Sequence, residues 1–175
     1  MTRPLRMNSL ELATNHWEHV QVHRHDSRRI GPAEAAGILA YVLPMYGISQ
    51  IPHVEWTDSS SFEHLQGAVA SCDSHTGVIR VHMPHAFSTT VLLHEAAHLL
   101  VEDPLDRMEL RPVLERGFHG PLFYACFLSL LDQTVGRHMP ALSKIRLMGS
   151  LTQTVPELGP VQWYPTVRGV PKPGL

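Results

Sequence analysis

Cysteine is scarce in this 175-residue chain, which contains only Cys72 and Cys126. Two cysteines cannot build a disulfide framework or a cysteine-rich metal cluster, so both of these classes of small protein are excluded. The composition therefore predicts a protein of a reducing compartment, and we expect it in the cytoplasm.

Long hydrophobic runs are also lacking. The longest, residues 36–45 and 121–131, are shorter than the ~20 apolar residues that a transmembrane helix needs. The opening stretch, MTRPLRMNSLELATNHW, contains no apolar core of the kind that signal peptides have. We therefore expect a soluble, intracellular protein that does not bind a membrane.

Charge of either sign is modest, because 14 Lys and Arg against 16 Asp and Glu leave a formal net charge of −2. This balance gives no general attraction to nucleic acid or to anionic lipid. Only the N-terminal segment is locally basic, with Arg3, Arg6, Arg24, Arg28 and Arg29. Any binding of nucleic acid is therefore expected to be local and to involve this segment.

Length and composition divide the chain into three segments. A chain of this size is long enough for one domain with its own core. Residues 1–30 are polar and rich in His and Arg, and they are predicted to form an N-terminal arm. Residues 31–140 carry the apolar periodic stretches of the domain, and residues 141–175 are predicted to form an extended, Pro/Gly-rich tail.

Local patterns predict an α+β domain with helices around a small twisted sheet. Pro32 suits a first helical turn and begins a helix that ends or kinks near Pro44. Strands are predicted at 17–22 in the arm, at 51–56, and at 67–73 and 77–83, which form a hairpin. N-cap residues at 88–90 begin a second helix that ends at 103–104, and a third is predicted over 121–138.

The second of these helices carries two histidines and a glutamate in an apolar sequence, VLLHEAAHLL. His94 and His98 are four residues apart, so they lie on one helix face, about 6 Å apart along the axis. Neutral imidazoles at this spacing can bind one Zn²⁺ ion, and a catalytic site adds a third protein ligand and a water. Glu95 projects beside the metal and is predicted to accept a proton from the zinc-bound water.

A metal-free interpretation of the motif is a hydrogen bond between a histidine and the glutamate in the core. The 13 histidines of the chain also raise the frequency of such a motif by chance. The leucines and alanines around the motif favour the metal, because burying a carboxylate beside two imidazoles is costly unless a cation organises them.

A third metal ligand is expected after His98, although the extended pattern HExxHxxGxxH is not present. The candidates are one histidine and three acidic residues: His119, Glu102, Glu109 and Glu115. His119 is favoured, because it stands just before Gly120-Pro121 at the start of the next apolar helix, where rigid structure fixes its position.

The pairing of VLLHEAAHLL with HGPLF at residues 119–123 resembles the SprT-like zinc metallopeptidases, the family that includes the Spartan proteases. The likeness covers residues 67–131. It implies a zincin-like catalytic domain at 31–140, the zinc ligands His94, His98 and His119, Glu95 as the base, and Phe123 as a packing aromatic. No cysteine-rich zinc ribbon follows, so the DNA-linked role of several members is not implied.

The sequence thus predicts a zinc metallopeptidase that hydrolyses a polypeptide substrate. Two alternatives stay open: a non-peptidase zinc metallohydrolase, and a zinc-stabilised binding or structural module without activity. The donor that stabilises an oxyanion is left open among Tyr124, His85 and His82. The carboxylates that orient the zinc histidines are left open among Asp103, Asp106 and Glu109.

Overall fold

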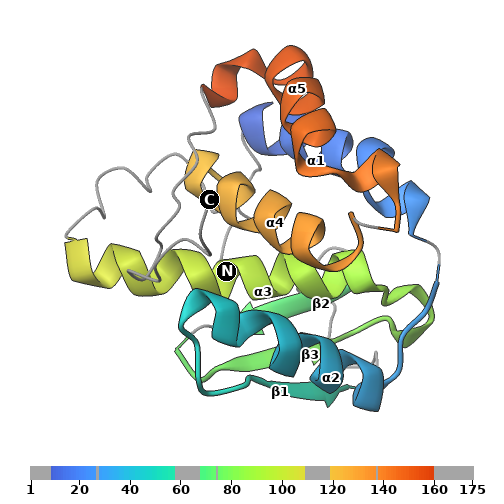
Figure 1. The fold of residues 1–175 in the computed structure, drawn as a ribbon, viewed down its shortest axis with the longest axis vertical. Helices are drawn as coiled ribbons and strands as arrows, with labels where there is room; N and C mark the ends of the chain where they lie inside the picture. Colours follow the sequence, from blue (N-terminus) through green and yellow to red (C-terminus); the bar gives the residue numbers. More distant parts are fainter. Residues whose placement is uncertain are drawn as a thin grey trace, which may run out of the picture.

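The computed structural model describes residues 9–26, 28–57, 68–73, 75–108, 119–136 and 138–159, without the side chains of Glu11 and residues 102–108. Within these ranges the chain forms helices and a small sheet, which confirms the predicted α+β class (Figure 1). The α-helices are α1 (Ser9–Gln21), α2 (Pro32–Val42), α3 (Thr89–Met108), α4 (Pro121–Thr134) and α5 (Lys144–Thr154). The strands are β1 (His53–Trp56), β2 (Ala70–Asp73) and β3 (Val78–Val81).

The sheet has the strand order β1-β3-β2. β3 is paired in parallel with β1 and antiparallel with β2, which confirms the predicted hairpin. β1 confirms the strand predicted at 51–56. Along β3, Ile79 and Val81 are buried, whereas Val78 and Arg80 are half-buried, so successive side chains alternate between the core and the outer face.

Helix α3 lies between the sheet and α4, so that these elements form successive layers (Figure 1). α3 packs against β2 and against α4, and α2 contacts β1, α3 and α4. α5 packs on α4 and on α1. Because α3 has neighbours on both sides, its first half lies in the centre of the apolar core.

α3 begins at Thr89, as the N-cap residues predicted. The hydroxyl of Ser88 accepts a hydrogen bond from the Val91 amide, and the carboxylate of Asp26 accepts one from the Thr90 amide. The predicted end at 103–104 is wrong, because the helix continues through Pro104 to Met108. A proline removes one helical hydrogen bond but does not prevent the helix from continuing at a kink.

The strand predicted at 17–22 is also wrong, because these residues belong largely to α1. Burial follows the helical period, because Thr14, Trp17, Glu18 and Val22 are buried. α1 therefore brings one face of the predicted arm, including a glutamate, into the interior.

The predicted extended tail is wrong over residues 144–154, which form α5. Leu147 and Leu151 are four residues apart and both are buried, and Trp17 of α1 donates a hydrogen bond to Ser150 of α5 at 3.1 Å. The Pro/Gly-rich composition of the whole segment obscured this short helical pattern. Residues 160–175, with the aromatic pair at 163–164, lie outside the described residues.

The remaining helix predictions are close to what is observed. α2 begins at Pro32 and passes into a 3₁₀ turn, Leu43–Tyr46, so the predicted end near Pro44 is confirmed. α4 begins at Pro121 and ends at Thr134, a little before the predicted position 138. None of the helices in the described ranges combines the length and apolar character that a bilayer crossing requires.

Candidate metal centre

Three half-buried imidazoles converge from α3 and from the segment just before α4. His94 and His98 come from adjacent turns of α3, and His119 stands just before α4. Their ring centroids are 5.2 Å apart for His94–His98, 4.9 Å for His94–His119 and 5.1 Å for His98–His119. One ring nitrogen of each lies within 4.8 Å of those of the other two, so the group can hold a metal ion.

The dimensions of this group suit a small divalent cation with nitrogen ligands. The Nε2 atoms of His94 and His119 are 3.1 Å apart. Two nitrogens bound at 2.0–2.1 Å in a tetrahedral zinc site are separated by about 3.3 Å. The separation of these two nitrogens is therefore close to that of two nitrogen ligands of one zinc ion.

Phe123 forms the apolar wall behind the three imidazoles. Its ring centroid lies 4.9 Å from that of His94, 4.7 Å from His98 and 4.6 Å from His119. It projects from the first turn of α4, four residues after His119, and is almost fully buried. Phe123 thus fixes the positions of all three rings.

We expect Phe123→Ala to lower the free energy of unfolding by about 3–5 kcal/mol, since it leaves a cavity in the core. It should also weaken zinc binding, because the three rings lose their common support. Chemical denaturation and zinc titration measure the two effects. Leu131→Ala, which truncates another buried side chain of α4, is the control: equal loss of zinc affinity in both variants would contradict this role.

The protonation states of the three histidines differ. Burial, followed by the charge of His94, lowers the pKa of His98 well below its ordinary value and that of His119 to about 4. Both rings are therefore neutral near pH 7 and have a free nitrogen lone pair, as metal binding requires. Burial also disfavours charge on His94, but the carboxylate of Glu18 outweighs it and raises the pKa to about 8.

Glu18, from α1, is a component of the site that sequence reasoning missed. Its Oε1 atom lies 2.5 Å from Nδ1 of His94 and 2.9 Å from Nε2 of His23, and its Oε2 accepts a 3.4 Å hydrogen bond from the Tyr124 hydroxyl. Burial alone would raise the pKa of Glu18, but the charges and hydrogen bonds of His94 and His23 lower it below its ordinary value. Glu18 is therefore a buried, ionised carboxylate.

The signal that could have identified Glu18 is its place in a helical pattern. Read with a period of 3.6, the segment puts this glutamate on the same face as Thr14, Trp17 and Val22. A glutamate on the buried face of a helix needs a partner in the interior. The predicted orienting residues Asp103, Asp106 and Glu109 lie outside the described side chains, as do the alternative ligands Glu102 and Glu115.

Glu95 is buried beside the cluster, and it belongs to neither group of residues that can hold a metal. Its carboxyl accepts a hydrogen bond from the backbone of Cys72 in β2. Burial, together with the negative charge of Glu18, raises the pKa of Glu95 in spite of the nearby imidazoles. The side chain thus lies near β2 and the histidine cluster, and it is not among the residues that could hold a metal.

The three candidates for an oxyanion donor lie in different surroundings. His82 is buried at the end of β3, with Nε2 at 2.8 Å from the Ser71 hydroxyl and Nδ1 at 3.4 Å from that of Thr57. His85 is exposed. Tyr124 is buried, and its hydroxyl is directed to Glu18. The structure therefore places His82 next to the sheet, where it bonds to side chains, and Tyr124 beside the histidine cluster.

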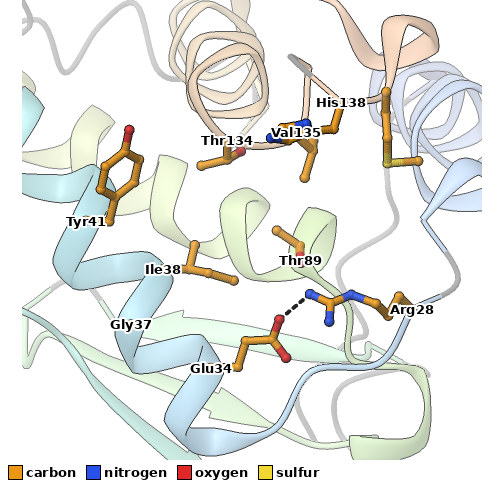
Figure 2. Close-up of a pocket in the computed structure, with 10 residues that line it drawn as sticks. Arg28, Glu34, Gly37, Ile38, Tyr41, Thr89, Thr134, Val135 and His138 are labelled. Atoms are coloured by element: carbon orange, nitrogen blue, oxygen red, sulfur yellow. Dashed lines mark hydrogen bonds and ion pairs between the residues drawn. The ribbon is translucent and has the colours of Figure 1, made fainter.

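A pocket of about 550 Å³ lies elsewhere, between α2, the start of α3 and the end of α4 (Figure 2). Ile38, Val135 and Met139 contribute apolar walls, and Arg28 and Glu34 form an ion pair at its edge. None of the predicted metal ligands or Glu95 lines it. The chemistry suggested by the sequence is therefore concentrated at the histidine cluster and not in this pocket.

Comparisons of the chain with protein-family models, with curated proteins and with solved structures found no match. Conclusions about function therefore depend on the geometry of the site.

Proposed function

We propose that this protein is a zinc-dependent metallopeptidase with a zincin-like fold. The observation that carries the proposal is the convergence of His94 and His98 of α3 with His119, just before α4, next to the buried carboxyl of Glu95. Three protein nitrogen ligands would leave a further position of a bound zinc ion for water or substrate, which is the arrangement of catalytic rather than structural zinc sites.

The proposed chemistry divides between the cation and the chain. When bound, zinc supplies a Lewis acid that polarises the scissile carbonyl and lowers the pKa of water toward about 7. His94, His98 and His119 would hold the ion, and the ring of Phe123, which contacts all three imidazoles, would keep them in place. Glu95 would accept the proton of the attacking water and pass it to the leaving amine, a role in keeping with the upward shift of its pKa that burial causes.

The sheet offers a place to align an extended polypeptide. Strand β3 is central and has a partner on both sides, so a substrate strand would have to pair with an outer strand. Among the described strands, β2 is the edge that packs on α3, and its Cys72 backbone contacts Glu95. A substrate paired with β2 by strand addition would therefore run past the base and the histidines.

The test is zinc-dependent cleavage of a broad peptide library by the purified full chain, with products identified by mass spectrometry. We expect cleavage with about one zinc per chain, its loss on treatment with a chelator, and its recovery when zinc is restored. Hydrolysis confined to small amides or esters would favour the non-peptidase metallohydrolase. Stoichiometric zinc without any hydrolysis would favour the structural module.

A further inference from the structure

We propose that Glu18 is a positioning residue for metal binding, which acts by fixing the tautomer and orientation of His94. This inference rests on the metal centre of the proposed function but not on hydrolysis. It assigns to α1, a helix of the N-terminal segment, a direct part in the affinity of the site for its ion.

The two nitrogens of His94 face different partners. Nδ1 lies 2.5 Å from the carboxylate of Glu18, whereas Nε2 lies 3.1 Å from Nε2 of His119. A carboxylate only accepts hydrogen bonds, so Nδ1 carries the proton and donates it to Glu18. In the neutral ring the lone pair is then on Nε2, the nitrogen that faces the other candidate ligands. A hydrogen bond of this kind also makes the imidazole a stronger ligand.

Glu18 is itself held in one orientation by groups from three elements. His23, just beyond α1, meets Oε1 at 2.9 Å, and Tyr124 of α4 donates to Oε2 at 3.4 Å. Nδ1 of His23 is 3.0 Å from the hydroxyl of Thr90 at the start of α3. If the Thr90 hydroxyl donates to Nδ1, the proton of His23 is on Nε2 and points at Glu18. The carboxylate thus has a donor for each oxygen besides His94.

The arrangement around Glu18 is better explained by hydrogen bonds than by a second metal ion. Glu18, His23 and His94 also lie close enough together to hold a cation. However, the oxygen–nitrogen distances of 2.5 and 2.9 Å are hydrogen-bond lengths, and both imidazoles share one carboxylate oxygen. His94 would need to use both nitrogens as ligands if two ions were bound. A stoichiometry of two zinc ions per chain would therefore contradict the assignment.

Because Glu18 is buried, we expect its replacement to weaken metal binding. The residue is only 3% exposed, and an ionised carboxylate at such a position persists only when charged or hydrogen-bonding partners compensate for the loss of water. Without it, the ring of His94 is free to rotate and to place its proton on Nε2. Part of the metal-binding free energy would then be used to restore the productive orientation.

The test compares zinc affinity and metal geometry in Glu18→Gln, Glu18→Ala and the unmodified full chain. Zinc affinity is measured by competition with a chromogenic chelator, and geometry by the visible spectrum of the Co²⁺-substituted protein. We expect affinity to fall by about 10–100-fold in Glu18→Ala, the usual effect of losing a partner of a metal-bound histidine. Glu18→Gln keeps an acceptor oxygen without the charge, so its loss should be smaller, with an altered Co²⁺ spectrum.

Ser150→Ala is the matched control, since it removes the hydrogen bond from Trp17 that joins α1 to α5 without touching the cluster. It should leave zinc affinity and the Co²⁺ spectrum unchanged. If it weakens zinc binding as much as the Glu18 variants do, the docking of α1 explains the effect and the positioning role is overturned. Unchanged affinity and spectrum in Glu18→Gln would overturn it too, which keeps the test decisive if Glu18→Ala does not fold.

The failure of this inference and that of the proposed function can be told apart. If the unmodified chain binds one zinc but cleaves no peptide, the peptidase proposal fails while a weaker metal site in the Glu18 variants still supports the positioning role. If peptides are cleaved and the Glu18 variants bind zinc normally, only the positioning role fails. A chain that binds no zinc at all would refute both.

Discussion

Replacing Glu95 with glutamine is expected to reduce peptide hydrolysis by a factor on the order of 10²–10⁴, the contribution of a general acid–base residue, while zinc stays bound. Glutamine has almost the same size and shape as glutamate but cannot accept a proton at neutral pH. Its amide oxygen can still accept the backbone hydrogen bond from Cys72 that the carboxyl accepts in the native chain. The three imidazoles are not altered, so the metal site should persist.

Two measurements on the same preparation check this prediction: the zinc content per chain and kcat/KM on a cleaved peptide. Glu157→Gln, which removes an exposed carboxyl near the end of α5, should be active and serves as the control. Turnover close to that of the native chain in Glu95→Gln would show that another group acts as the base. Loss of zinc together with activity would show that Glu95 supports the metal site instead.

Replacing His119 with alanine is expected to lower zinc content from about one ion per chain to almost none at micromolar metal. The variant loses one of three ligands, and the effect should exceed the ~10–100-fold loss that removal of an outer partner causes. The two remaining imidazoles, four residues apart on α3, would bind an ion only weakly. Folding should survive, because the ring is half-buried at the start of α4 and not part of the apolar core.

Thermal unfolding with and without zinc provides a second measure of this effect. A ligand that binds only the folded state stabilises it by about 2.7 kcal/mol at a concentration 100 times its Kd. The native chain should therefore show a higher Tm in zinc, and His119→Ala should not. His85→Ala, which removes an exposed histidine, should respond to zinc like the native chain. Full zinc binding by His119→Ala would point to another third ligand.

Several elements were predictable because their signals lie within a few residues. Proline at a first helical turn marked α2 and α4, N-cap residues marked α3, and alternation with a turn marked the β2–β3 hairpin. The spacing of His94 and His98 is likewise a local property of one helix. Their placement on a common face needed only the helical period.

The errors arose where local signals conflict or are weak. At residues 17–22 a short stretch with Trp and Val suggested a strand, but residues 17–21 belong to α1, whose Trp17 packs against Tyr124 of α4. In the C-terminal segment, the many prolines and glycines favoured an extended tail, although Leu147 and Leu151 have the spacing of one helix face. Helix α5 is stabilised by contacts with α1 and α4, which no local pattern describes.

The sequence by itself determined that His94, Glu95 and His98 lie together, because one helical turn joins them and their spacing alone sets their relative positions. Only the tertiary structure decided that His119 meets them across two helices, and that Glu18, 76 residues away from His94 along the chain, completes the hydrogen bonding of the cluster. The physical reason is that helical hydrogen bonds connect near neighbours, whereas the partners of a buried charge are chosen by how the helices pack, which no short segment encodes.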